Sequence, residues 1–307
     1  MKEYFIWLAK FLTVLLVVFL VVPVFAAVVL VAMESLIEGK NLVGSGKNVV
    51  AVVELEGEIE SSKDVVNELY KQARDKEVKG IVLRINSPGG AVGPSQDIYD
   101  AVRKIKKIKP VIASMGSVAA SGGFYSALGA SKIFCQPGTL TGSIGVILQV
   151  PNFSAIADKY GFKMVTVKSG KMKDVGNPFR GMKPEEKAFL ESTVKKVHAQ
   201  FVDAVVKGRG LPLEKVKEFA DGRVIVGSDA KKLGLVDGFG GVRTAARAVF
   251  DELGKPLKEN EYPELRYRKE PLEDFKKALR GLAHLSDTVR GRAGLYYLAE
   301  LSGVVLK

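Results

Sequence analysis

The sequence of 307 residues predicts an α/β fold in which helices and strands alternate in layers. From residue 49 onward, short apolar runs rich in Val and Ile alternate with longer segments of helical period, which is typical of a sheet with right-handed crossover helices. Gly-rich turns follow two of the apolar runs, at residues 87–90 and 121–123, where the strands of such a sheet end and ligands gather. The sequence therefore predicts a layered βαβ domain with a ligand site at its strand ends.

The first half of this domain alternates strictly. The run VVAVVEL reads as a buried strand, and the segment after it reads as a helix with Ser61 or Ser62 as its cap. A short helix of small residues begins at Ser121. The predicted strands are 49–55, 80–86 and 110–115, and the predicted helices are 61–78, 95–108 and 121–130.

The second half continues the alternation and contains one long helix. The long helix begins near Pro184, a residue favoured in the first turn. The predicted strands are 132–136, 142–148, 163–169 and 223–226, and the predicted helices are 153–161, 184–207, 212–220, 228–234 and 242–253.

An uncharged segment precedes the domain. Residues 11–33 carry no charge, and at about 1.5 Å per residue a helix of this length crosses the roughly 30 Å core of a bilayer. A cleaved signal peptide would have a shorter apolar region and a small-x-small site after it. We therefore predict a retained transmembrane anchor. Lys2 and Lys10 precede it, which places the N-terminus in the cytoplasm and the rest of the chain outside.

The domain boundaries follow from these shifts in composition. We expect a cytoplasmic N-terminus over 1–10, the anchor over 11–33, a Gly-rich linker over 34–48 and the main domain over 49–254. Residues 255–307 are predicted to form a charged linker and a tail with an amphipathic helix. That helix would pack on the main domain or a neighbouring subunit, or bind the membrane surface.

Composition limits the classes of partner and cofactor. The formal charge of +12 is scattered among acidic residues, without the clusters of a nucleic-acid site, and it suits an anionic lipid surface. Cys135 is the only cysteine, so an intrachain disulfide is impossible, and its apolar neighbours predict a buried thiol. The only histidines, His198 and His284, lie on unrelated helices, which argues against a zinc site and against a Ser-His-Asp triad.

Ser121 lies just before Gly122 and Gly123, so it either is a nucleophile on a tight turn or only starts a helix of small residues. A serine can be activated by a neutral lysine, because burial disfavours the charged ammonium form. No lysine follows Ser121 at the S-x-x-K spacing, so the base must come from elsewhere in the chain. The loop INSPGG, which ends at Gly90, could supply a second N–H group for an oxyanion.

Five blocks together resemble the signal peptide peptidase A family, over about residues 49–253. They are KGIVLRINSPGGAV, SMGSVAASGGFYSALGASKIF, TLTGSIGVI, VKSGKMKDVGNPFR and ADGRVIVGSDAKKLGLVDGFGG. The family consists of membrane-anchored Ser/Lys peptidases with a Clp protease/crotonase-like fold, and this chain is similar to its short, single-repeat kind.

The resemblance implies a role for five residues. Ser121 would be the nucleophile and Lys173, in the block SGKMKD, the general base. Gly90 and Gly122 would donate to the oxyanion, and Ser143 would help to hold the lysine amine. Two further lysines, Lys168 and Lys171, lie close to Lys173 and remain alternatives for the base.

The function that the resemblance implies is a membrane-bound serine endopeptidase that degrades cleaved signal peptides or other hydrophobic peptides. It would need no metal or other cofactor, would assemble as a ring-like homo-oligomer and would bind extended substrates as an added strand. One alternative is a stomatin-associated membrane serine protease. Another is a crotonase-type acyl-CoA enzyme, which would use paired N–H groups without a nucleophile. The tail is also a conceivable substrate of the enzyme itself.

Overall fold

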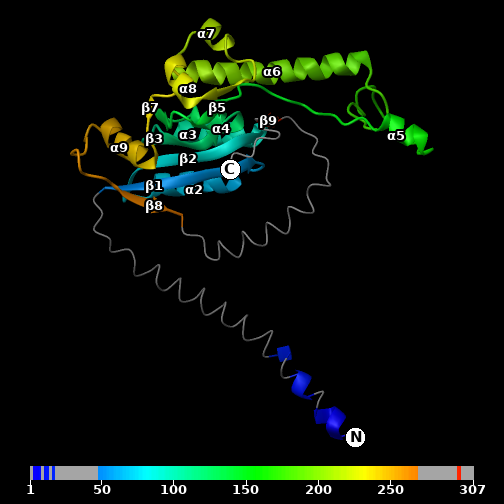
Figure 1. The fold of residues 1–307 in the computed structure, drawn as a ribbon, viewed down its shortest axis with the longest axis horizontal. Coiled ribbons are helices and arrows are strands. Elements are labelled where there is room, and N and C mark those ends of the chain that lie inside the picture. Colours follow the sequence, from blue (N-terminus) through cyan, green and yellow to red (C-terminus); the bar gives the residue numbers. More distant parts are fainter. Residues whose placement is uncertain (1–2, 8–9, 14–15, 18–47, 269–295, 299–307) are drawn as a thin grey trace. The chain divides into compact units, whose positions relative to one another are not determined.

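The computed structural model describes residues 3–7, 10–13, 16–17, 48–268 and 296–298. The first three ranges are short, exposed helical stretches. The predicted anchor lies largely outside the described residues, and within the described part no helix is long and apolar enough to cross a membrane. The remaining ranges form a mixed α/β domain (Figure 1).

Parallel strands form the centre of this domain. The strand β1 pairs in parallel with β2, which pairs with β3, and β3 pairs in turn with β4. Their bounds are Val49–Ile59 for β1, Val78–Ala91 for β2, Val111–Ala119 for β3 and Lys132–Cys135 for β4. The helices α2 (Lys63–Arg74) and α3 (Val92–Ile105) make the first two crossovers. The parallel order brings the carboxyl ends of β2 and β3 to the same edge.

Helices cover both faces of the sheet, which explains the continuous apolar runs. Along β1, Ala51 and Val53 belong to the larger core, and Val50 and Val52 belong to a second, smaller one. The larger core contains residues of α2, α3, α4 (Gly122–Ala127) and α6 (Pro184–Arg209). The smaller core is closed by α9 (Val242–Glu252).

A small antiparallel extension lies beside the carboxyl end of β3. The strand β5 (Leu140–Gly142) pairs with β3 through Leu140 and Val118, and pairs antiparallel with β6 (Val224–Val226). The connecting elements are α7 (Leu213–Lys217), α8 (Gly227–Leu233) and β7 (Gly238–Phe239), which pairs with β4.

The long helix α6 is anchored only at its C-terminal half. Phe201, Val202, Ala204 and Val205 are buried there, whereas Glu186 is the only buried residue of its first half. Residues 146–183, called the arm below, connect the region after β5 to the start of α6 and include α5 (Ser154–Lys159). In Figure 1 the arm is green and extends past the sheet to the N-terminal end of α6.

Three predictions of secondary structure were wrong. Residues 163–169 form no strand and are exposed, because they lie in the arm, where no neighbouring strand pairs with them. The predicted strand 142–148 is also wrong, since β5 ends at Gly142 and the chain leaves the sheet there. The predicted turn at residues 87–90 is part of β2, which continues to Ala91 because Gly90 still pairs with Ile59.

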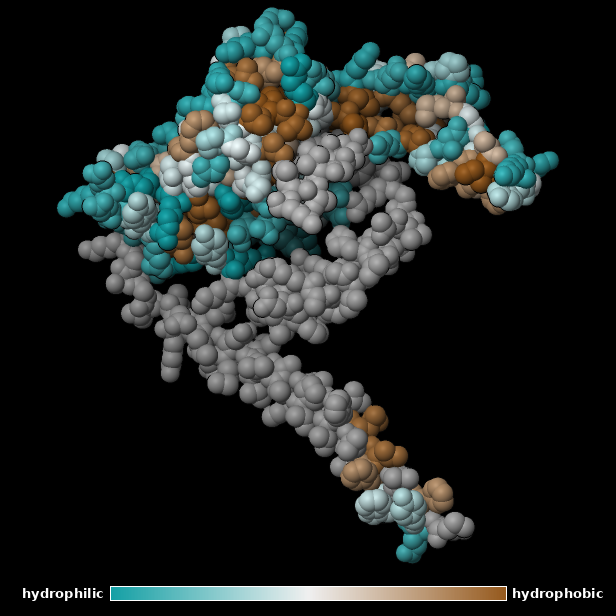
Figure 2. Space-filling view, in the orientation of Figure 1, coloured by the Kyte–Doolittle hydropathy of each residue, from teal (hydrophilic) through white to brown (hydrophobic). Residues whose placement is uncertain are grey.

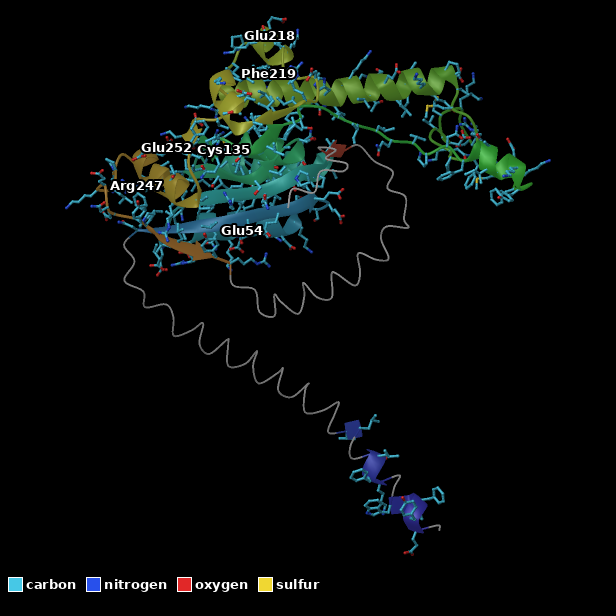
Figure 3. All side chains as sticks on the ribbon, viewed as in Figure 1. Glu54, Cys135, Glu218, Phe219, Arg247 and Glu252 are labelled. Atoms are coloured by element: carbon cyan, nitrogen blue, oxygen red, sulfur yellow. The ribbon has the colours of Figure 1, made fainter. Side chains whose placement is uncertain are left out.

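The segment after residue 254 was predicted to be a linker, yet it contributes a strand. Arg247 of α9, labelled in Figure 3, donates to the carbonyl oxygens of Leu257, Lys258, Glu259 and Glu261 and so holds this segment. The chain then forms β8 (Glu264–Tyr267), which pairs in parallel with β1. The predicted amphipathic helix of the tail lies outside the described residues.

Candidate active site

Ser121 lies between the end of β3 and the first residue of α4, in a backbone conformation that side chains rarely adopt. Its φ is 51°, in the left-handed region, and its N–H donates to the carbonyl of Gly142 at 2.8 Å. Strain of this kind at a strand-to-helix turn is typical of functional sites. The hydroxyl is fully buried, and it has no hydrogen-bond partner among the described residues.

The two predicted oxyanion glycines lie on neighbouring segments, Gly122 directly after Ser121 and Gly90 at the end of β2. Gly122 begins α4, so its N–H has no partner within the helix, and the described residues give it none. Gly90 comes from the end of β2, and the two segments are joined because Ala120 N–H donates to the Ser87 carbonyl at 3.1 Å. The predicted oxyanion residues therefore come from adjacent strand ends, as expected for a parallel sheet.

Ser143 lies on the segment that holds Ser121, because it directly follows Gly142. Its φ is 49°, its N–H donates to the Arg223 carbonyl at 2.8 Å, and the residue is buried. Together with Ser121 it is one of two non-glycine residues with positive φ in the described part of the chain. The structure thus brings Ser121, Gly122, Gly90 and Ser143 into one region.

Two threonines brace this region, and our sequence analysis missed both. The Thr141 hydroxyl donates to the Ala119 carbonyl at 2.7 Å, and the Thr139 hydroxyl donates to the Gly116 carbonyl at 2.8 Å. These bonds tie β5 and the residue before it to the second half of β3. Both threonines belong to the block TLTGS, in which the sequence predicts a role only for Ser143.

A strand from the chain's own C-terminal region pairs with the end of β2 that contains Gly90. The strand β9 (Tyr296–Leu298) runs antiparallel to β2, with Tyr297 opposite Gly90 and Leu298 opposite Gly89. The edge of β2 beside the predicted oxyanion residue therefore accepts an extended peptide backbone.

Lys173 is not brought to Ser121 within the chain. It is exposed in a turn of the arm, and this turn is bound to Glu186 through Arg180. Phe201, whose ring lies 6.5 Å from that of Phe124 near Ser121, follows Glu186 by fifteen residues of α6. Fifteen helical residues span about 22 Å. The geometry therefore places the predicted base and nucleophile at different ends of α6.

The other two lysines of this block differ in their partners. Lys168 forms an ion pair with Asp174 and donates to the Lys171 carbonyl at 3.2 Å. Lys171, like Lys173, is exposed on the turn. Of the three candidates, Lys168 is thus the one whose ammonium group is already bound to a carboxylate.

Two other titratable residues named in the sequence analysis, His198 and Cys135, lie in packed parts of the domain. His198 lies on α6, as predicted, and its Nε2 lies 3.2 Å from the Ile144 carbonyl oxygen. Cys135, labelled in Figure 3, is buried as predicted, and burial raises the pKa of its thiol to about 11.

Comparisons with known proteins agree with this geometry. The family model described as peptidase family S49 matches residues 103–254, and the Clp protease model matches residues 47–139. A Synechocystis sp. protein provisionally named a protease is 41% identical over 197 residues, which cover 64% of this chain and 71% of that protein.

Two further relatives have more specific names. An Enterococcus faecium protein provisionally named signal peptide peptidase SppA is 40% identical over 179 residues, which cover 58% of this chain and 52% of that protein. The chloroplastic serine protease SPPA of Arabidopsis thaliana is 34% identical over 197 residues, which cover 64% of this chain and 29% of that protein. The match thus spans about half or less of these two relatives. The chain belongs to peptidase family S49, the signal peptide peptidase A family, and is a serine peptidase with a Clp-protease-like α/β domain.

Proposed function

We propose that the chain is a membrane-anchored serine endopeptidase that cuts hydrophobic peptides, including cleaved signal peptides, with a Ser121/Lys173 dyad. One observation carries this proposal: the Ser121 hydroxyl is buried on a left-handed turn and has no partner among the described residues. Leaving a buried hydroxyl unbonded costs about 1–3 kcal/mol, so such a group calls for an explanation. A nucleophile kept free for its substrate and base supplies that explanation.

The proposed reaction is acyl transfer. Neutral Lys173 takes the proton of Ser121 Oγ while the oxygen attacks the carbonyl carbon of the peptide. The resulting oxyanion accepts hydrogen bonds from the N–H groups of Gly90 and Gly122. The Lys173 ammonium group returns the proton to the leaving amine as the C–N bond breaks. Water then attacks the Ser121 ester with Lys173 again as the base, which releases the acid and restores the hydroxyl.

We propose further that Lys173 of one copy serves Ser121 of a second copy. The exposure of Lys173 and its place at the far end of α6 support this, since the same chain does not bring the two together. An apolar groove of about 460 Å³ also lies between the arm and α6, and Figure 2 shows hydrophobic side chains along this helix. Its apolar lining comprises Leu148, Val150, Met182, Leu190 and Val194.

Exposed apolar grooves of this kind mark contact surfaces. A head-to-tail contact in which each arm reaches the next copy closes into a ring when the rotation permits. The groove and the arm therefore support the ring-like homo-oligomer that the family resemblance implies.

The substrate would bind as an added strand along Gly89–Ala91. The antiparallel pairing of Tyr296–Leu298 with this edge supports an antiparallel substrate strand. It shows a peptide backbone already lying beside Gly90 in that direction. Residues 11–33 would hold the catalytic domain outside the membrane with the N-terminus in the cytoplasm. Hydrophobic peptides released in the bilayer would then reach the enzyme by lateral diffusion.

The test is cleavage of a hydrophobic peptide by the full chain in detergent. Ser121→Ala and Lys173→Ala are each expected to lower kcat/KM by about 1,000-fold or more, while the proteins stay folded. Ser117→Ala, which removes an exposed serine of the same block, is the matched control and should retain activity. Peptide cleavage that survives in Ser121→Ala would reject Ser121 as the nucleophile. A wild-type chain that cleaves no peptide but turns over an acyl-CoA thioester would favour the crotonase-type alternative.

A further inference from the structure

Arg180 ties the turn that carries Lys173 to the start of α6. Its guanidinium donates to Asp174 from Nε to Oδ2 at 3.0 Å, and from Nη2 to the carbonyl oxygen at 3.0 Å. The same group binds both carboxylate oxygens of Glu186, at 2.6 Å and 2.8 Å. Bidentate contacts fix orientation as well as charge. The backbone beside Lys173 is therefore held by a helix.

A second cation completes this group of charges. Lys168 pairs with Asp174 Oδ1, on the oxygen that Arg180 leaves free. The side chain of Glu186 is only 1% exposed, and one of its oxygens also accepts the Lys183 N–H at 3.0 Å. Lys168, Asp174, Arg180 and Glu186, called the Arg180 cluster below, thus contain two positive and two negative charges. Their sum is zero.

Asp174, Glu186 and Arg180 keep their charges over a wide range of pH. Hydrogen bonds from Arg180 and then Lys168 lower the pKa of Asp174 to about 2. Hydrogen bonds from Arg180 and from the Lys183 backbone lower the pKa of Glu186 to about 2. The two carboxylates in turn raise the pKa of Arg180. These three groups are therefore charged at neutral pH.

The charge of Asp174 matters because this residue directly follows Lys173. An unpaired carboxylate within about 4–6 Å stabilises an ammonium group and so opposes the loss of its proton. A base that must be neutral would be weakened by such a neighbour. Arg180 and Lys168 bind this carboxylate from both sides, so its ion pairs in the described part of the chain are with them and not with Lys173.

We propose that Arg180 and Lys168 are positioning residues for the base: they bind the Asp174 carboxylate and fix its turn, so that the amine of Lys173 has no carboxylate partner there and is free for the Ser121 hydroxyl. The proposal rests on the Ser121/Lys173 dyad proposed above. It holds whether Lys173 serves its own chain or a second copy, because the whole Arg180 cluster travels with Lys173. It also gives the two lysines different roles, since Lys168 acts as a cation on Asp174 and Lys173 acts as a neutral amine.

The other charged groups that face this chemistry do not belong to the cluster. Lys171 is exposed on the same turn. At the Ser121 end, Arg223 is paired with Asp221, and His198 contacts the Ile144 carbonyl. All of them are unchanged in the variants below, so their contributions cancel in the comparison.

The experiment measures kcat/KM for a hydrophobic peptide against pH. Arg180→Met leaves the cluster with one net negative charge, so the inflection of the profile should move upward by about one pH unit. Asp174→Asn leaves one net positive charge and should move it downward by a similar amount. The control is Lys207→Met, which removes a cation from an exposed pair with Asp203 at the other end of α6. It should leave the inflection of the pH profile unchanged.

Two more variants separate charge from geometry. The double variant Arg180→Met with Glu186→Gln restores a net charge of zero, so its inflection should return to the wild-type pH. Arg180→Lys keeps the charge but loses the bidentate contact, so it should keep the wild-type inflection with a lower plateau. Thermal unfolding of each variant at neutral pH identifies any that fail to fold.

The results distinguish this proposal from the one on which it rests. Opposite shifts in Arg180→Met and Asp174→Asn support the Arg180 cluster. Lowered plateaus with an unmoved inflection, or shifts in the same direction, would overturn it and leave a structural role only. If Lys173→Ala remains active, the dyad itself fails, and that result is independent of both shifts.

Discussion

The backbone of Gly90 packs directly against the backbone of Ile59. A Cβ on Gly90 would come within 2.4 Å of the Ile59 carbonyl oxygen and 2.5 Å of its nitrogen. Parallel pairing of β1 with β2 brings the two residues opposite each other. The proposed oxyanion donor is therefore set by the register of two strands that are far from the nucleophile in sequence.

Gly90→Ala should damage both stability and activity. The added methyl group meets backbone atoms, which cannot rotate away, so we expect a loss of about 1–3 kcal/mol in the free energy of unfolding. Displacement of the N–H should also lower kcat by about 100-fold. Urea unfolding and peptide cleavage measure the two effects.

Gly93→Ala is the matched control for this substitution. A Cβ there meets no atom within 4 Å, and the residue lies in α3, where Ala is preferred to Gly. We expect unchanged activity and equal or higher stability. Equal stability and equal activity of Gly90→Ala and Gly93→Ala would show that the close contact between Gly90 and Ile59 does not matter.

Mixing two inactive variants tests whether the site is shared between copies. Ser121→Ala keeps Lys173, and Lys173→Ala keeps Ser121, so a mixed oligomer contains some sites with both groups intact. Random mixing of two copies per site should restore about a quarter of the wild-type activity. The variants are coexpressed as full chains, and cleavage of a hydrophobic peptide is measured on the purified assembly. No recovery in assemblies shown to be mixed would place both residues of the dyad in one chain.

The pairing of β9 with the edge beside Gly90 predicts competition with substrate. Tyr297→Pro removes a backbone donor from this antiparallel strand, so the strand should leave the edge more often. We expect the KM of a short hydrophobic peptide to fall by about two- to tenfold while kcat stays constant. A higher KM would show instead that β9 helps to form the substrate site.

Acid should loosen the arm before the central sheet. Asp174 and Glu186 have pKa values lowered to about 2, from ordinary values of 3.8 and 4.5. Their stabilising effect is therefore fully present above about pH 4.5 and is lost as the pH falls toward 2, because the unfolded chain binds protons first. Hydrogen exchange of residues 168–186 between pH 5 and pH 2.5 measures this loss.

Glu186→Gln should flatten that pH dependence, because the group that titrates is gone. Glu191→Gln is its control on the same helix, since Glu191 is exposed and lies 3.8 Å from Lys187. If the two variants keep the same pH dependence as the wild type, the ion pairs of Arg180 do not hold the arm.

The elements of the central sheet were predictable because their signals are local. Continuous apolar runs predicted β1 and β3, and helical periodicity predicted α2, α3 and α6, within a few residues of their observed bounds. The arm was not predictable in this way. The run KMVTVKS alternates like a strand, yet a strand needs a partner, and no partner is supplied by the described part of the chain. In the same way, β8 was hidden by its charged neighbours until its pairing with β1 was known.

The sequence by itself determined the family of this protein and predicted its chemistry. A serine before two glycines, a second glycine pair at a strand end and a lysine-rich block predict a peptidase with a serine nucleophile and a lysine base. Only the tertiary structure decided how these groups meet. Strand register brings Ser121, Gly122, Gly90 and Ser143 together, whereas α6 holds Lys173 at its far end. The physical reason is that residue types and short periods are local properties, while register, the direction of a long helix and the pairing of distant charges depend on packing between segments far apart in the chain.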